Sequence, residues 1–71
     1  MNENSCRLGE FIREQRINKG YSQFQFGRLV GVSDRAVSKW ENGTARPRAV
    51  LLPKICKVLN VSYEELLSNM E

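Results

Sequence analysis

The stretch from Gln23 to Asn42 constrains the fold more than any other part of this 71-residue chain. It contains a short helical pattern, a turn centred on Gly31 and a second helical pattern. Two helices joined by so short a turn cross at about 90–120°. Such a crossing requires a small residue where the two helices meet, and we expect Gly27 to be that residue. It also requires a residue that tolerates a left-handed backbone in the turn, and Gly31 is suited to that conformation.

Apolar residues in this stretch fall where a contact between two helices requires them. In the first helix, Phe26, Leu29 and Val30 are expected to share the inner face. In the second helix, Val37 and Trp40 are three residues apart and mark the buried side. These side chains predict that both helices pack onto one hydrophobic core.

Capping signals predict where these two helices begin. Ser22 followed by Gln25 fits a capping box, in which each residue hydrogen-bonds the backbone of the other. Ser33 fits an N-cap, and Asp34 follows in the first turn, where the helix dipole favours a negative charge.

Three more helices are predicted outside this stretch. The first has a stripe at helical spacing and ends at Gly20; the stripe consists of Leu8, Phe11, Ile12 and Gln15. Another spans about residues 51–59 with Pro53 in its first turn, and the last begins at a second capping box formed by Ser62 and Glu65. No segment alternates long enough to be a strand. We therefore expect an all-α, compact bundle of five short helices in a single domain over 1–71, with its core at about 8–67 and the two-helix motif at about 22–43.

Composition excludes most catalytic and metal chemistry. The chain has no histidine, and its two cysteines, Cys6 and Cys56, are too few for a zinc site and too far apart for a redox CxxC motif. We expect no enzyme activity, no metal and no cofactor. Cys56 lies in an apolar helical pattern and is expected to be buried, whereas Cys6 is expected to be partly exposed. A disulfide between them is disfavoured because the absence of a signal peptide and of a membrane span predicts a cytoplasmic protein.

The net charge of +3 conceals an uneven distribution. Nine basic and two acidic residues lie between Arg16 and Lys57, whereas both ends of the chain are net negative. Such a basic centre suggests a surface that meets a polyanion, although scattered solvated charges would give the same count. The outer face of the second helix of the motif carries polar side chains suited to base edges in a major groove, namely Asp34, Arg35, Ser38 and Lys39.

The segment from Ser22 to Gly43 resembles the central signature of the lambda-repressor-like, Cro-type helix-turn-helix regulators, also called the XRE family. The run from Trp40 to Gly43 is its most specific part, and the tail from Leu52 to Leu67 resembles that family's fourth and fifth helices. The resemblance implies a transcriptional regulator that binds double-stranded DNA with sequence specificity. We expect repression rather than activation. We also expect the chain to bind as a homodimer to a palindromic operator.

By position, the resemblance also implies roles for single residues. The positions that contact bases are Asp34, Arg35, Ser38 and Lys39. The positions that contact phosphates are Gln23, Asn42, Gly43, Arg46 and Arg48. Arg16 and Glu41 match an internal ion pair between the first helix and the end of the third. The dimer surface would involve the loop after Gly43 and the region near Val61 and Tyr63.

Three residues depart from the family pattern. Gln15 stands at a usually apolar position, Gly27 replaces the usual alanine, and Phe24 occupies a position where an exposed acidic residue is common. An exposed Phe24 and the acidic last helix favour a second hypothesis. On that hypothesis the chain is a protein-interaction module, such as the antitoxin of a toxin–antitoxin pair.

Overall fold

The computed structural model of the chain describes residues 7–70, and within that range it contains helices and turns but no strand. Its elements are α1 (Arg7–Asn18), α2 (Gln23–Val30), α3 (Asp34–Asn42), the 3-10 turn η2 (Ala49–Leu51), α4 (Leu52–Leu59) and α5 (Tyr63–Leu67). The predicted all-α bundle of five short helices is confirmed. The expectation for Cys6 lies outside the described residues.

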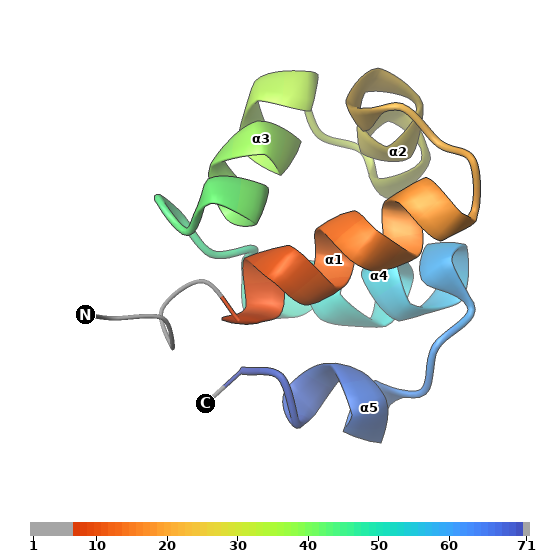
Figure 1. The fold of residues 1–71 in the computed structure, drawn as a ribbon, viewed down its shortest axis with the longest axis vertical. Coiled ribbons are helices and arrows are strands. Elements are labelled where there is room, and N and C mark those ends of the chain that lie inside the picture. The colour runs from red at the N-terminus through yellow and green to blue at the C-terminus, as the bar shows by residue number, and fades with distance from the viewer. Residues whose placement is uncertain (1–6, 71) are drawn as a thin grey trace.

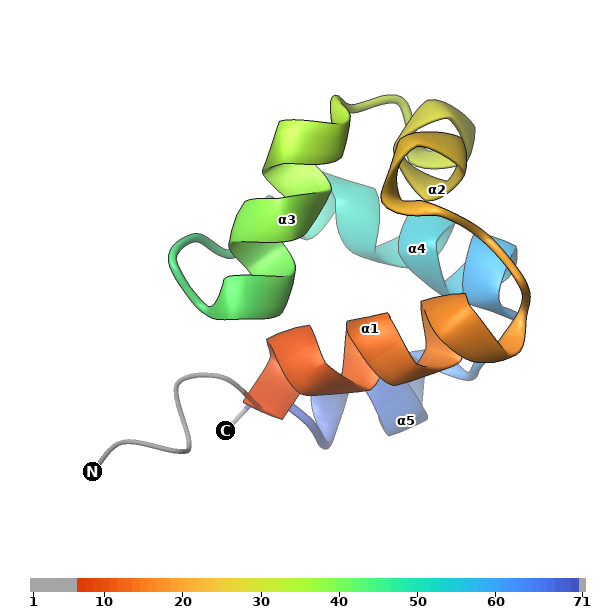
Figure 2. The ribbon, with the colours of Figure 1, turned by 45° about the horizontal axis from the view of Figure 1, so that its top comes forward.

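The helices surround one core, with α1 across the middle of the molecule. The α2–α3 pair lies on one side of α1, α5 lies on the other, and α4 lies behind α1 (Figure 1). The turned view separates α4 from α1 and shows it behind the α2–α3 pair, with α5 behind and below α1 (Figure 2). All five helices supply buried apolar side chains, which are Leu8, Ile12, Phe26, Val30, Val37, Trp40, Leu52, Ile55, Cys56, Leu59 and Leu66. The α2–α3 pair therefore packs on the core with its inner side, and its outer side faces away from the rest of the bundle.

Three serine hydroxyls cap helix N-termini, as their positions in the sequence predict. Ser22 Oγ accepts a hydrogen bond from the Gln25 N–H at 3.0 Å, and Gln25 Oε1 accepts one from the Ser22 N–H at 2.8 Å. Ser33 Oγ caps α3 by accepting from the Ala36 N–H at 3.2 Å. At α5, Ser62 Oγ accepts from the Glu65 N–H at 2.9 Å, which is the first half of the predicted capping box. Each bond satisfies one backbone donor that the helix leaves unpaired.

The turn between α2 and α3 depends on Gly31. Its φ of 95° lies in the left-handed region, and its N–H donates to the Gly27 carbonyl oxygen at 2.7 Å. A residue with a Cβ is strained in this conformation, so the predicted role of Gly31 is confirmed. Asn60 closes α4 in the same way with a φ of 59°, and the sequence pattern did not single it out.

The predicted contact at Gly27 is confirmed, but the prediction for Leu29 is wrong. A Cβ on Gly27 would lie 2.7 Å from the Val32 carbonyl oxygen, so this side of α2 must face the turn. Phe26 and Val30 flank Gly27 and are buried. Successive residues are about 100° apart around a helix, so centring the inner face on these three residues moves Leu29 beyond its edge. Leu29 is consequently 47% exposed.

A second close approach, at Gly9, was not predicted. Gly9 is buried in α1 against the end of α3, where a Cβ would collide with the Trp40 carbonyl oxygen and lie 2.9 Å from that of Glu41. Both obstacles are backbone atoms, which cannot move aside as the tip of a flexible side chain could. Gly9 therefore sets how closely α1 and α3 approach each other.

We expect Gly9→Ala to lower the free energy of unfolding by about 1–3 kcal/mol, because the added methyl group overpacks the contact with α3. At an open helix position the same substitution would stabilise by about 1 kcal/mol through helix propensity, so overpacking and helix propensity predict changes of opposite sign. Urea denaturation measures the effect. Glu10→Ala, at the exposed neighbouring position, is the control and should stay within about 0.5 kcal/mol. Unchanged or increased stability of Gly9→Ala would show that α1 and α3 can separate without cost.

Candidate nucleic-acid interface

The outer side of α3 carries the four polar residues that the sequence singled out for base contact. Asp34, Arg35 and Lys39 are exposed and Ser38 is half-buried, whereas Val37, Trp40 and Glu41 on the opposite side are buried. We call the four outer residues the α3 polar face. The split arises because positions i, i+1, i+4 and i+5 share one side of a helix. The structure therefore brings all four residues together on a surface that the core does not need.

A buried ion pair fixes the C-terminal end of α3. Arg16 Nε donates to Glu41 Oε2 at 2.6 Å, and Arg16 Nη2 donates to Glu41 Oε1 at 3.1 Å. This bidentate geometry is the one that guanidinium and carboxylate groups favour. The ion pair between Arg16 and Glu41 expected from the family resemblance is present, and the two residues are 25 positions apart in the chain.

Two further contacts extend this pair to the start of α2. Arg16 Nη1 donates to the Tyr21 carbonyl oxygen at 2.7 Å, and Gln23 Nε2 donates to Glu41 Oε1 at 3.1 Å. One cluster thus joins the end of α1, the start of α2 and the end of α3. Within residues 7–70, every buried side-chain nitrogen and oxygen has a hydrogen-bond partner. Burial without an unpaired group is what makes such a cluster tolerable inside a small core.

The contact of Gln23 with Glu41 was not predicted from the sequence. Its side chain is half-buried, and the bond to Glu41 orients its amide group beside the last turn of α3. A primary amide carries two N–H donors, so one of them can hold Glu41 while the other is directed elsewhere. A glutamine at the start of the first helix and a glutamate near the end of the second could have predicted this contact, given the spacing of the two-helix motif.

The turn after α3 is shaped by Gly43. Its φ is 81°, and its N–H donates to the Trp40 carbonyl oxygen at 3.2 Å. The N–H groups of Thr44 and Ala45 both donate to the Lys39 carbonyl oxygen, at 2.9 and 3.2 Å. These amides therefore close the helix, and the turn presents its side chains rather than its N–H groups to the surroundings. Asn42 precedes this turn and is exposed.

Two arginines flank Pro47 in the loop that follows. Arg46 and Arg48 are both exposed, whereas Pro47 is buried and anchors the loop between them. The Arg46 guanidinium donates to the Met70 carbonyl oxygen at 3.5 Å, so this side chain leans toward the C-terminal segment. The Arg48 side chain makes no such hydrogen bond within residues 7–70, so the two arginines differ in their surroundings.

We also searched the described residues for a metal site, a reactive thiol and a membrane-spanning helix. Residues 7–70 hold no group of three His, Cys, Asp or Glu side chains that could bind a metal. Cys56 is buried, as predicted, and burial raises the pKa of its thiol. No helix in this range is long and apolar enough to cross a membrane.

Comparison with known proteins agrees with this geometry. A family model described as helix-turn-helix matches residues 12–66. The antitoxin PezA of Streptococcus pneumoniae serotype 4 is 36% identical over 59 residues, which cover 83% of this chain and 37% of PezA. The transcriptional activator BcrR of Enterococcus faecalis is 37% identical over 64 residues, which cover 90% of this chain and 31% of BcrR. The chain thus spans about a third of the length of these relatives.

A solved structure with a similar fold was determined on DNA. The c2 repressor protein of Salmonella phage P22, in complex with a synthetic operator, superposes with a TM-score of 0.81 and 35% sequence identity. The match covers 87% of this chain and 94% of that one.

We expect Glu41→Ala to lower the free energy of unfolding by about 3–5 kcal/mol, because it leaves the buried Arg16 guanidinium without a carboxylate. The double variant Arg16→Met with Glu41→Leu should recover much of that loss, since two apolar side chains leave no buried charge. Thermal and urea unfolding measure both effects. Glu14→Ala removes an exposed glutamate and is the control. Equal stability of Glu41→Ala and Glu14→Ala would contradict a structural role for the pair.

Proposed function

The chain belongs to the Cro/C1-type helix-turn-helix family, and from this premise we propose that it binds double-stranded DNA sequence-specifically and regulates transcription. The observation that carries the proposal is the α3 polar face, which is exposed while the opposite side of the same helix is fixed in the core. A helix presented in this way fits the width of the major groove of B-DNA. The proposal assigns the chain no catalytic step.

Base recognition falls to the α3 polar face. Arg35 and Lys39 are suited to the guanine O6 and N7 acceptors, and Asp34 is suited to accept from a cytosine amino group. Ser38 can donate or accept, so it adds a contact without demanding one base. All four side chains extend from two successive turns of one helix, which keeps their targets within a few neighbouring base pairs.

Phosphate contacts would fix the register of α3 in the groove. Gln23 and Asn42 lie at the two ends of the motif that the buried cluster joins, and Arg46 and Arg48 extend the positive charge into the following loop. Gly43 contributes by shaping the turn from which Asn42 and the loop depart. Contacts of this kind position a protein on DNA and carry no sequence information themselves.

One such domain makes few contacts, so we propose that it binds as a homodimer to a palindromic operator. Dimers of this motif place their half-sites about 34 Å apart. Large apolar side chains remain exposed in the region suggested for the dimer contact, with Val50 76% and Tyr63 46% exposed. Val61, by contrast, packs against the core. We propose repression, by covering a promoter, as the outcome. We propose the cytoplasm as the location, because the similar proteins come from bacteria, whose DNA lies there.

The antitoxin PezA is similar to this chain, which keeps a protein-interaction module as the second candidate. Selection of bound sequences from a random duplex DNA pool separates the two. We expect an enriched palindrome with half-sites one helical turn apart. A failure to bind any duplex at low salt would overturn the DNA-binding proposal and favour the interaction module.

We expect Arg35→Ala to weaken binding to the selected operator by about 1–3 kcal/mol and to relax the preference at one base position. Arg48→Ala should instead weaken all duplexes alike, because a phosphate contact does not depend on sequence. Repeating the selection with each variant measures both effects. An unchanged sequence preference in Arg35→Ala would remove that residue from base recognition.

The affinity for DNA should fall steeply with salt. If each protomer neutralises about four phosphates, a dimer releases about eight counterions, and the logarithm of the affinity should fall against the logarithm of salt concentration with a slope of about −7. Fluorescence anisotropy on a labelled operator measures the slope. Arg48→Ala should make it shallower by about two for a dimer. A slope near zero would contradict a phosphate-based interface.

A further inference from the structure

The outward side of α2 carries an apolar surface that neither the core nor the proposed DNA contacts use. Phe24 is 57% exposed and Leu29 is 47% exposed, and both stand on a helix of only eight residues. A shallow depression of about 290 Å³ lies beside Leu29, lined by Tyr21, Gln25, Arg28 and Leu29 itself. We call Phe24 together with these four lining residues the α2 patch.

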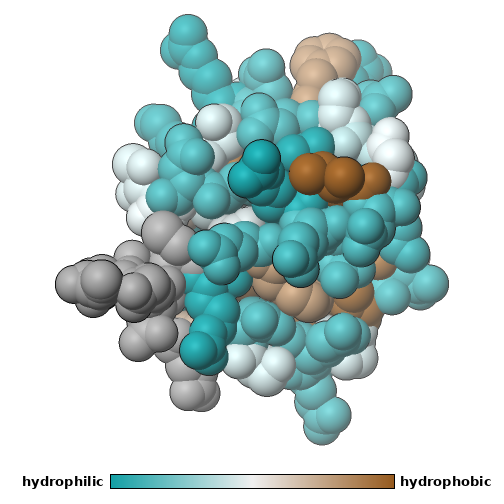
Figure 3. Space-filling view, viewed as in Figure 1, coloured by the Kyte–Doolittle hydropathy of each residue, from teal (hydrophilic) through white to brown (hydrophobic). Residues whose placement is uncertain are grey.

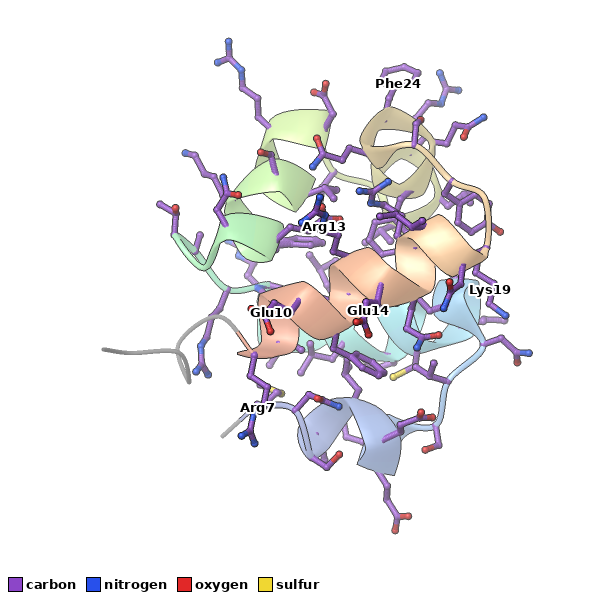
Figure 4. The ribbon with its side chains drawn as sticks, viewed as in Figure 1. Arg7, Glu10, Arg13, Glu14, Lys19 and Phe24 are labelled. Carbon is purple, nitrogen blue, oxygen red and sulfur yellow. The ribbon has the colours of Figure 1, made fainter. Side chains whose placement is uncertain are left out.

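The exposed side chains of Phe24 and Leu29 are a surplus of apolar surface that the core does not use. The helix is attached to the core through Phe26 and Val30, which are at most 1% exposed. Phe24 projects from α2 away from the bundle (Figure 4). In the space-filling view, hydrophobic atoms interrupt an otherwise hydrophilic outline above α2 (Figure 3). Phe24 and Leu29 are five positions apart, and Arg28 lies between them around the helix, over the Phe24 ring and beside Leu29 in the depression. Exposed apolar side chains gathered on one side of a small protein mark a contact surface more often than isolated ones do.

The charges on the stretch of chain that forms the α2 patch have one sign. No aspartate or glutamate occurs between Gln15 and Ser33, whereas this stretch includes Lys19 and Arg28. The Arg28 guanidinium lies 5.8 Å from the centre of the Phe24 ring, within the range of a cation–π interaction. Arg28 therefore lies over the face of the aromatic ring and keeps N–H donors for a carboxylate.

Other exposed apolar residues lack this combination. Ile17, which is 54% exposed, lies beside Glu10, Arg13 and Glu14, so both signs of charge surround it. Tyr63 and Leu67 lie on α5, whose first turn is acidic. Val50 is 76% exposed on a basic stretch, but no aromatic residue occurs between Trp40 and Tyr63. Among residues 7–70, the α2 patch alone joins a large exposed aromatic, an exposed aliphatic side chain and a cation with no carboxylate on the same stretch.

We propose that the α2 patch binds an acidic amphipathic segment of another protein. Large apolar side chains of that segment pack on Phe24 and Leu29 and fill the depression beside Tyr21. Its carboxylates pair with Arg28, which supplies the charge complementarity that selects such a partner. Aromatic and arginine side chains side by side are the residues that most often dominate binding energy at protein interfaces. A DNA phosphate would satisfy Arg28 but would leave the apolar side chains in water.

The experiment is a selection from a phage-displayed library of random peptides of about twelve residues, with the intact chain as bait. The library is first depleted on the double variant Phe24→Ala with Leu29→Ala. Peptides enriched on the unaltered chain should carry several Asp or Glu residues together with at least two large apolar residues. Synthetic copies should bind the double variant and Arg28→Glu at least about tenfold more weakly, and should shift the amide NMR signals of residues 21–30.

Matched controls separate this surface from others. Ile17→Ala removes an equally exposed apolar side chain elsewhere and should change peptide affinity by less than about twofold. Circular dichroism and a gel shift with duplex DNA check that the double variant folds and retains its DNA affinity. Both substitutions are on exposed positions, so we expect both properties to be retained.

Four results would overturn the proposal. The first is a lack of enrichment over the double variant, and the second is enrichment of peptides without acidic residues. The third is loss of DNA binding by the folded double variant, which would assign the α2 patch to the DNA interface. The fourth is self-association that depends on Phe24 in sedimentation equilibrium, which would make a second copy of this chain the occupant.

Discussion

The buried ion pair between Arg16 and Glu41 is the interaction on which the rest of the structure depends. It joins α1 to the end of α3, and the bond from Gln23 adds the start of α2 to the same cluster. A buried pair of this kind contributes more to geometry than to net stability, because desolvation offsets most of the attraction. Its effect is to hold the far end of α3, while Val37 and Trp40 hold the side that faces the core. The α3 polar face therefore has a fixed direction without using any of its own side chains.

Backbone proximity complements this side-chain cluster. Gly9 in α1 approaches the end of α3, and Gly27 in α2 approaches the turn that precedes α3, both so closely that a Cβ would meet backbone carbonyl oxygens. Ion pair and glycines act together, because the short distance between α1 and α3 is what brings Arg16 within reach of Glu41. In a domain this small, where the core supplies little stability to spare, a few such contacts decide the orientation of a nine-residue helix.

Local signals in the sequence were sufficient to predict the helices, but they were insufficient to predict how some of the helices are rotated against the core. Serine caps, Gly31 and the spacing of Val37 and Trp40 predict the helices correctly, because each acts within a few residues. The error at Leu29 has a different origin: the rotation of α2 is set by the contact of Gly27 with the following turn, which periodicity does not describe. The hydrogen bond from Gln23 to Glu41 depends on the packed arrangement of the two helices. The ion pair was expected only by resemblance, and the roles of residues such as Arg35 and Arg48 in DNA binding stay predictions.

The division of α3 into a buried side and an exposed side has a consequence for how proteins of this kind can diverge. Val37, Trp40 and Glu41 are buried and attach the helix to the core, while the side chains of Asp34, Arg35 and Lys39 are exposed. Exposed substitutions away from caps and packing contacts usually change stability by less than about 0.5 kcal/mol. New combinations of side chains can therefore arise at the exposed positions without being removed by selection for a folded chain. Duplicated copies of such a gene can acquire different targets one residue at a time, without passing through an unfolded intermediate form.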